Sequence, residues 1–399
     1  MSYNSLMAIT DCRHFSGYKP CNKGEKCDSS CASMDVPTMS VLIVHLGALG
    51  AVVRSTSLLK AIKRKYPRSM VTWVTDAPAH YLLKNHPAID RVLTTAEADL
   101  LQLGALEFEV ALVIDKSLKA VGVLKRTTVD QVFGFTASPR NGAIVPATPA
   151  AEELWELGLN NQKKFFENEK PETQLMIEAL ELGEYQRDDY WLPLTENETR
   201  EATLRHYQWL SERNKELIIG LNTGCSPVIP YKKLTVDYHR MMIERILKDF
   251  PKAEVVLLGG PEDTDRNALI AQGLPVISSQ TESGLRDGLI SVAACDVVIT
   301  GDSLGMHMAI SQQKQVIAWF GPTCAHEIDL YDRGFKILTK SPCSPCWKRT
   351  CEKNIMCYDQ VSLEEIVHAL ESCCANSLSG RLTALHSTSE EVPGTLAST

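Results

Sequence analysis

Apolar runs that are short enough to be strands alternate with amphipathic stretches along most of this chain. The first clear run is VLIV at residues 41–44, and a glycine-bearing turn follows it at 45–50. The residues beyond this turn place Leu58, Leu59 and Ile62 at helical spacing. The segment therefore predicts a buried strand, a turn and an amphipathic helix, which is typical of the first unit of an α/β domain.

The same alternation recurs in both halves of the chain. In the first half, predicted strands at 70–75 and 110–117 enclose a turn and helix at 76–87. A helical region from about 149 to 210 leads into a second set of predicted strands, at residues 216–222, 253–260, 296–300 and 315–321. Because strands joined by helices pair in parallel, we predict two doubly wound, Rossmann-like α/β domains that face one another across a cleft.

This pattern divides the chain into four segments. The polar, cysteine-rich residues 1–39 precede the first predicted strand. Residues 40–195 and 196–376 form the two predicted Rossmann-like domains. The polar, low-complexity end at 377–399 has too few apolar residues to build a core, so we predict that it is disordered.

The composition of the 399 residues narrows the classes of function. Apolar residues make up 44%, charged residues 23%, and the net charge is -8, so the chain has no general electrostatic attraction to nucleic acid. The sequence has no run of about 18 apolar residues, and its first residues lack the basic start and apolar stretch of a secretory signal. We therefore predict a cytoplasmic protein without a nucleic-acid partner.

Polar residues that directly follow a predicted strand are the first candidates for binding, because ligands of open α/β sheets lie beyond the carboxyl ends of the strands. The most informative of these segments is GDSLGMHMA at 301–309. Asp302 or Ser303 can cap the helix that begins there, and the unpaired N–H groups of its first turn suit a diphosphate. His307 can donate to a phosphate oxygen, whereas Asp302 is better suited to sugar hydroxyls. A plain helix cap with a packed histidine is the alternative.

Together with the following strand and its end, VIAWFGPT, this segment resembles the signature of glycosyltransferase family 9, the ADP-heptose:lipopolysaccharide heptosyltransferases. Four other segments are similar to that family in the same order. LGALGAVVRSTSLLKAIKRKYP resembles its opening loop and helix, and GLNTGCSPVIPYKK its glycine-rich segment followed by a lysine. LLGGPED resembles its Gly-Gly element, and CSPCWKRTCEKNIMCYDQVSLEEI its C-terminal cysteine segment. The likeness spans residues 41–370, and five segments in order are more specific than any one.

The resemblance implies a GT-B fold, in which the first domain binds the acceptor and the second binds a nucleoside-diphosphate sugar. In the implied donor site, the phosphates meet Thr223 and Gly224, and Lys232 or Lys233 is the neutralising cation. The nucleoside meets Glu262 or Asp263, and the sugar meets Asp302. The diphosphate is surrounded by Ser303, Leu304, Gly305 and His307. A lysine and a helix N-terminus can stabilise a departing nucleoside diphosphate without a metal ion.

The acceptor site is predicted on the first domain, with Gly50, Arg54, Asp76, Lys116 and Lys119 as its candidates. The three cations suit an anionic acceptor. An ordinary solvated surface is the alternative interpretation for them.

The resemblance also exposes a missing group. In the family, the residue after the second glycine of the opening loop is an aspartate that serves as the base, and here it is Ala51. General-base help is typically worth about 10²–10⁴-fold in rate. Another carboxylate can replace it, with Asp115 preferred and Asp76 second, while His45 is more simply explained as a packed residue. Otherwise the protein binds the donor without efficient turnover, or Ala51 was introduced to trap substrate.

Eight of the thirteen cysteines fall in two sets, Cys12, Cys21, Cys27 and Cys31 before the first strand and Cys343, Cys346, Cys351 and Cys357 near the C-terminus. Four thiolates at short intervals can hold structural zinc or an iron–sulfur cluster. Disulfides are the competing interpretation, although they rarely persist in the cytoplasm.

The leading interpretation is a glycosyltransferase that moves a sugar such as a heptose from an ADP-heptose-like donor to a saccharide acceptor of a surface glycolipid. A catalytically weak nucleotide-sugar-binding protein is the alternative, and a sugar-nucleotide epimerase is a third candidate without a dedicated set of residues. The basic stretch at 60–68 would meet anionic headgroups if the acceptor is lipid-linked, which would place the protein at the inner face of the membrane. An ordinary solvated surface is the favoured alternative for this stretch.

Overall fold

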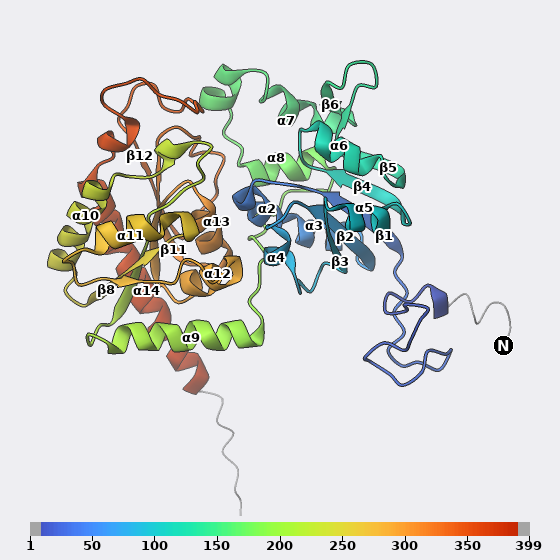
Figure 1. The fold of residues 1–399 in the computed structure, drawn as a ribbon, viewed down its shortest axis with the longest axis horizontal. Coiled ribbons are helices and arrows are strands. Elements are labelled where there is room, and N and C mark those ends of the chain that lie inside the picture. Colours follow the sequence, from blue (N-terminus) through green and yellow to red (C-terminus); the bar gives the residue numbers. More distant parts are fainter. Residues whose placement is uncertain (1–8, 390–399) are drawn as a thin grey trace, which may run out of the picture. The chain divides into compact units, whose positions relative to one another are not determined.

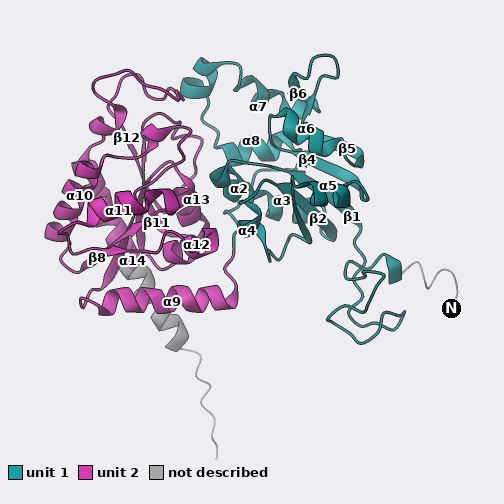
Figure 2. Ribbon diagram, viewed as in Figure 1, with its two compact units in different colours: residues 1–192 teal, residues 193–399 magenta. Residues whose placement is uncertain are grey.

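Two six-stranded sheets organise the chain (Figure 1). The computed structural model describes the backbone of residues 9–389 and the side chains of residues 9–377. The chain separates into two compact units, Met1–Leu192 and Pro193–Thr399 (Figure 2). Each unit contains one of the sheets, with its own helices.

The sheet of unit 1 has the strand order β3-β2-β1-β4-β5-β6. Its strands are β1 (Met39–Val44), β2 (Ser69–Thr75), β3 (Arg91–Thr94), β4 (Glu107–Val113), β5 (Thr128–Ala137) and β6 (Ile144–Pro146). Neighbouring strands pair in parallel except β5 and β6, which form an antiparallel pair. The chain moves outward from β1 to β3 and then returns to the other side of β1, so the sheet is doubly wound.

The central strand β1 is buried on both faces. The helices of this unit are α2 (Leu49–Ser55), α3 (Leu58–Lys65), α4 (His80–Leu83), α5 (Glu97–Leu103), α6 (Leu118–Leu124), α7 (Glu152–Glu156) and α8 (Glu172–Ala179). Val41 and Ile43 pack in one apolar cluster with residues of α3 and α8, and Leu42 and Val44 pack in a second cluster with residues of α5 and α6. A strand covered on both faces is a continuous apolar run in the sequence, as residues 41–44 are.

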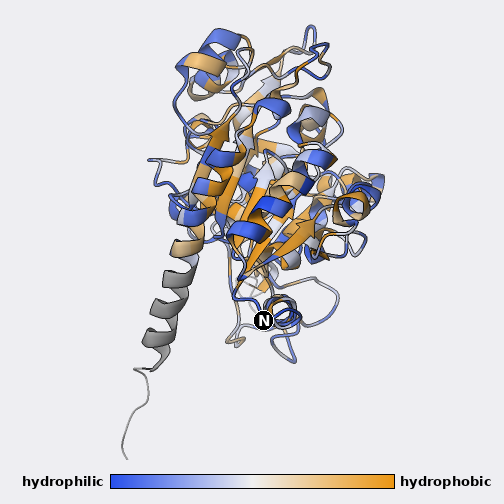
Figure 3. Cartoon of the chain, turned by 90° about the vertical axis from the view of Figure 1, so that its left-hand side faces the viewer, coloured by the Kyte–Doolittle hydropathy of each residue, from blue (hydrophilic) through white to orange (hydrophobic). Residues whose placement is uncertain are grey.

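The sheet of unit 2 is entirely parallel, with the order β12-β11-β10-β7-β8-β9. Its strands are β7 (Leu217–Asn222), β8 (Ala253–Leu258), β9 (Ile277–Ser278), β10 (Val297–Gly301), β11 (Gln315–Phe320) and β12 (Gly334–Leu338). The helices are α9 (Glu196–Ser211), α10 (Val236–Asp249), α11 (Thr264–Ala271), α12 (Leu285–Ala293), α13 (Leu304–Ser311) and α14 (Leu363–Ser389). Figure 3 shows the apolar strands beneath helices whose outer faces are polar, which accounts for the amphipathic spacing in the sequence.

An arginine fixes the cysteine-rich leader to the sheet of unit 1. The Arg13 guanidinium lies 2.7 Å from a carboxylate oxygen of Asp35 in the leader and 2.7 Å from one of Asp90, which precedes β3. The other Asp90 oxygen accepts a hydrogen bond of 2.8 Å from the Val71 N–H in β2. The leader is thereby tied to the β2–β3 side of the sheet.

The C-terminal segment differs in part from its prediction. Residues 377–389, predicted to be disordered, continue α14. The first turns of α14 are anchored in the core of unit 2 by Ile366, Leu370 and Cys373. A helix that has already formed extends without a new nucleation cost, and residues 377–389 contain no proline to stop it. The remaining predicted tail, 390–399, lies outside the described residues. None of the helices within residues 9–389 is long and apolar enough to cross a membrane.

Candidate functional site

The loops after β7, β8 and β10 meet at one edge of the unit 2 sheet, because β7 lies between β8 and β10. The chain reverses its direction of travel across the sheet at this point, which is where ligands of open α/β sheets bind. The predicted donor-site residues lie in these loops, in or next to the short helices η3 (Pro230–Lys232) and η4 (Pro261–Asp263), and in the first turn of α13 with the residues before it.

A lysine, an aspartate and a histidine form the charged centre of this edge. The Lys232 ammonium lies 3.1 Å from one carboxylate oxygen of Asp302, and Nε2 of His307 lies 3.9 Å from the other. Burial alone would raise the pKa of Asp302, but the nearby Lys232 and His307 together with the Thr323 hydroxyl outweigh burial and hold that pKa below its usual range. Asp302 is therefore ionised at neutral pH and fixes the position of the lysine.

The first turn of α13 can accept an anion. Ser303 is the N-cap residue of this helix, yet among the described contacts its side chain forms no hydrogen bond with the helix it precedes. Its hydroxyl instead accepts a hydrogen bond of 2.9 Å from the side-chain amide of Asn222, the last residue of β7. The N–H groups of Gly305 and Met306, which such a cap would satisfy, are thus left without it, and the helix dipole adds positive potential there.

Two neighbouring carboxylates predicted near the nucleoside have different surroundings. Asp263 is only 3% exposed and accepts a hydrogen bond of 3.1 Å from the Gly260 N–H, and burial raises its pKa. Any side chain at Gly224 would overlap the Asp263 carboxylate, so Asp263 lies directly against that turn. Glu262 is exposed. Of the two, Glu262 is the carboxylate open to a ligand.

The turn after β7 offers its backbone rather than its side chains. Thr223 is fully buried, and its hydroxyl donates a hydrogen bond of 2.5 Å to Asn267. The Arg266 guanidinium donates to the Thr223 carbonyl at 3.1 Å. Thr223 therefore shapes this turn, while the half-buried Lys233 lies next to Lys232 as a second cation.

On unit 1, the loop that lacks the expected base runs into α2. Gly50 and Ala51 are half-buried in the first turn of this helix. Arg54 follows on the same helix, is only 9% exposed, and lies 2.7 Å from the carboxylate of Glu172 in α8. The predicted anion-binding arginine is therefore already paired with a carboxylate that the sequence did not suggest.

Asp115 lies just beyond β4 and has the properties of a proton acceptor. One of its oxygens accepts a hydrogen bond from the Leu46 N–H, and the other lies 3.8 Å from Nε2 of His45. Burial raises the pKa of Asp115 to about 6, and burial lowers the pKa of His45 to about 3, so the histidine is neutral at pH 7. Its raised pKa makes Asp115 a stronger base than an ordinary carboxylate.

Asp76 is engaged by its neighbours. The Lys119 ammonium lies 2.7 Å from both of its carboxylate oxygens, and the Thr95 hydroxyl donates to it at 2.5 Å. Lys116 donates to the carbonyl of Leu154. Together with Arg54, four of the predicted acceptor-binding side chains are therefore held by contacts within unit 1.

The basic stretch at 60–68 also uses charges internally. The Lys63 ammonium donates to the Ser69 carbonyl at 2.9 Å. Arg64 forms a two-pronged contact with Asp188, at 2.7 and 2.6 Å. Less of this positive charge is therefore open to anionic lipid than the sequence suggests.

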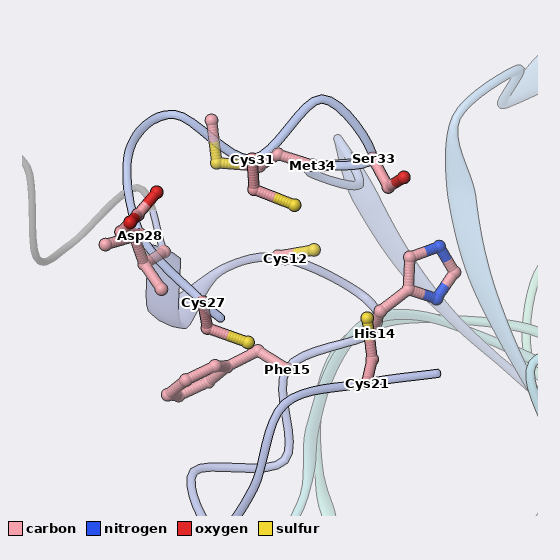
Figure 4. Close-up of a pocket in the computed structure, with 10 residues that line it drawn as sticks. Cys12, His14, Phe15, Cys21, Cys27, Asp28, Cys31, Ser33 and Met34 are labelled. Atoms are coloured by element: carbon pink, nitrogen blue, oxygen red, sulfur yellow. The ribbon is translucent and has the colours of Figure 1, made fainter. Parts of the chain in front are cut away.

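The leader cysteines line a pocket. Cys12, Cys21, Cys27 and Cys31 surround it together with His14 and Phe15. Figure 4 shows their sulfur atoms spread around this space rather than gathered at one point. The four thiols are free.

The C-terminal set also lines a pocket, and it consists of the free thiols of Cys343, Cys346, Cys351 and Cys357. The Cys351 N–H donates a hydrogen bond of 3.0 Å to the Tyr231 hydroxyl. Within the described residues, no three or more His, Cys, Asp or Glu side chains are grouped so that they could hold a metal ion. The structure therefore does not support the metal sites predicted for either cysteine set, because short spacing in the sequence does not bring the sulfurs to one centre. Disulfides were the competing interpretation, but every cysteine within the described residues is a free thiol.

Sequence reasoning did not select several residues that shape these sites. Asn222 ends a predicted strand, and this position is a general indication of a binding residue. Nothing else in the sequence distinguished Asn222 from its neighbours. Arg266 and Asn267 lie inside α11, and Glu172 lies in α8. Their contacts join segments that are far apart in the sequence, so no local pattern could have indicated them.

Comparison with known proteins agrees with this architecture. The chain is 22% identical over 308 residues to lipopolysaccharide heptosyltransferase 1 of Campylobacter coli, covering 71% of this chain and 84% of that protein. It resembles the crystal structure of a family 9 glycosyltransferase from Veillonella parvula, with a TM-score of 0.69 and 17% identity over 86% of this chain and 99% of that one. It also resembles ADP-heptose LPS heptosyltransferase II of E. coli, with a TM-score of 0.60 and 17% identity over 84% and 99%.

These likenesses confirm the predicted GT-B fold of two parallel-sheet α/β domains. The family model described as glycosyltransferase family 9 (heptosyltransferase) matches residues 101–356, well over half of the chain. The chain is therefore a glycosyltransferase, and it belongs to glycosyltransferase family 9.

Proposed function

We propose that this enzyme transfers a heptose from an ADP-heptose-like donor to a saccharide of a surface glycolipid such as the lipopolysaccharide core. Two of the proteins that this chain resembles, a lipopolysaccharide heptosyltransferase and an ADP-heptose LPS heptosyltransferase, support this donor and acceptor. The observation that carries the proposal is the pairing of Lys232 with Asp302 beside the uncapped first turn of α13. A fixed ammonium and backbone N–H groups are the groups that stabilise a departing diphosphate.

In the proposed reaction, the acceptor hydroxyl attacks the anomeric carbon from the side opposite the diphosphate. A new C–O bond forms, the bond to the diphosphate breaks, and the configuration at carbon is inverted. Lys232 and the N–H groups of α13 take up the negative charge of the leaving nucleoside diphosphate, so no metal ion is required. Glu262 is proposed to contact the nucleoside, and Asp302 the sugar hydroxyls.

We propose that Asp115 accepts the proton of the acceptor hydroxyl. It would replace the family's aspartate, whose position is occupied here by Ala51. Asp115 has a raised pKa and holds the Leu46 N–H, close to the loop that precedes α2. Asp76 is the weaker candidate, because Lys119 already pairs with both of its oxygens. The proposal includes a cytoplasmic location at the inner face of the membrane. Contact with lipid through residues 60–68 is not part of it, because Lys63 and Arg64 are engaged by groups of unit 1.

The test combines binding and turnover. Calorimetry with ADP is expected to show that Lys232→Ala weakens binding by at least about tenfold, since it removes the cation and leaves Asp302 uncompensated. Lys252→Ala is the matched control, because Lys252 pairs with Glu216 at 2.8 Å on the surface of the same unit. ADP release from ADP-heptose with a lipopolysaccharide core acceptor, unchanged by EDTA, would support the reaction. Equal ADP affinity of the two lysine variants would contradict the site.

A second candidate function is specifically favoured by Ala51. A protein that binds the donor without efficient turnover would keep the unit 2 site and lack a base. It would bind ADP as proposed but release no ADP above the background rate when donor and acceptor are both present.

A further inference from the structure

Asn222 connects three parts of the proposed donor site through one side chain. Its amide nitrogen lies 2.9 Å from the Ser303 hydroxyl, 3.2 Å from the Thr300 hydroxyl and 3.0 Å from the Gly224 carbonyl. These partners belong to the N-cap of α13, the end of β10 and the turn after β7. This amide thus contacts all three segments that would surround a diphosphate, and the Thr300 and Ser303 hydroxyls also lie 3.2 Å apart.

The same side chain lies directly against the first turn of α13. A Cβ atom added to Gly305 would lie 2.5 Å from Cγ and 2.6 Å from Oδ1 of Asn222. Real side chains do not approach this closely, so the absence of a side chain at position 305 is what lets Asn222 reach Ser303. This fit fixes the position of the amide relative to the helix.

The hydrogen bond to Ser303 has a consequence for the helix. A serine at the N-cap normally accepts a hydrogen bond from the second or third N–H of its own helix. The Ser303 hydroxyl accepts from Asn222 instead and does not cap α13 in the described structure. The helix therefore keeps its first N–H groups for another acceptor.

We propose that Asn222 is a positioning residue that turns Ser303 away from capping α13 and so keeps the N–H groups of this helix open for the diphosphate of the donor. The inference rests on the proposed function, because it assumes that a nucleoside diphosphate binds at this edge. Without the amide, the Ser303 hydroxyl can rotate onto its own helix, and a ligand must then displace an internal cap. Asn222 acts through Ser303 and the helix rather than on the reacting atoms.

The test uses ADP calorimetry and thermal melting on the full chain. Asn222→Leu keeps a branched side chain of similar size, and Asn222→Ala provides a second variant in case leucine disturbs folding. Both are expected to weaken ADP binding roughly tenfold, the size of a serine cap that must be displaced. Asn168→Ala is the control, because Asn168 also bridges backbone groups, at Lys170, but lies in unit 1. It is expected to leave ADP affinity unchanged.

Rescue separates positioning from a general structural role. Adding Ser303→Gly to Asn222→Ala removes the hydroxyl that would cap the helix, and it is expected to recover most of the lost ADP affinity. Failure of this rescue, or unchanged affinity in both Asn222 variants while Lys232→Ala still weakens binding, would overturn the inference and leave the proposed function standing. If the unaltered protein binds none of ADP, GDP and UDP, the proposed function and the inference both fail.

Discussion

Replacing Asp115 by asparagine is expected to change stability and catalysis in opposite directions. Burial raises the pKa of Asp115 from 3.8 to about 6, and its side chain is only 16% exposed. A carboxyl with a higher pKa in the folded state holds its proton more tightly when folded. Its stabilising contribution is therefore fully present below about pH 3.8 and is lost as the pH rises through about 6. The shift of roughly two units corresponds to about 3 kcal/mol of unfolding free energy above pH 6.

The Asp115→Asn variant keeps an oxygen for the Leu46 N–H but has no charge to bury. At pH 7.5 its unfolding free energy is expected to exceed that of the unaltered protein by about 1–3 kcal/mol, and near pH 4 the two should converge. Its transfer rate is expected to fall by about 10²–10⁴-fold, because the proton acceptor is gone. In the unaltered enzyme, kcat/KM should fall roughly tenfold per pH unit below about pH 6, and the variant should lack this dependence.

Urea unfolding at pH 4 and pH 7.5, together with ADP release between pH 5 and 8, measures both effects. Asp130→Asn is the control, because this carboxylate is exposed on β5 of the same unit. A variant of Asp115 that keeps its transfer rate would place the base elsewhere. Loss of rate together with a lower unfolding free energy at pH 7.5 would show that Asp115 is a structural residue.

Three further outcomes are expected. Ala51→Asp should raise the transfer rate, by up to about 100-fold if position 51 faces the acceptor; unchanged ADP release would show that α2 does not present this position to it. Gly224→Ala should lower the melting temperature, since its new methyl group would overlap the Asp263 carboxylate, whereas Gly122→Ala in α6 has open space and should leave it unchanged or raise it. Similar shifts in the two glycine variants would contradict this reasoning. Titration of the unfolded protein without reductant should detect thirteen thiols, and a lower number would reveal disulfides.

The strands that the sequence predicted well are those at the centre of each sheet. Residues 41–44 and 217–221 are apolar along their whole length because these strands are buried on both faces. By contrast, β3, β5, β6, β9 and β12 were not predicted. These strands contain exposed or half-buried residues, so their apolar signal is weak.

The loops of the candidate site followed from the fold, but their contacts did not. Strand ends indicated where Lys232 and Asp302 lie along the chain, while their ion pair depends on how η3 packs beside β10. Asp263 and Glu262 are adjacent in sequence, and the turn of η4 decides that the first is buried and the second exposed. The cysteine spacing suggested metal sites, yet the described sulfurs do not converge, because spacing sets only the length of chain between thiols.

The attachment of the leader affects how this enzyme should be truncated. A boundary drawn at the start of β1 would suit the fold, but it would remove Arg13 and deprive Asp90 of the guanidinium that pairs with it. Asp90 also accepts a hydrogen bond from the Val71 N–H in β2, so removal of Arg13 would disturb a contact of the sheet itself. Shortened versions intended for crystallisation should therefore begin upstream of Arg13.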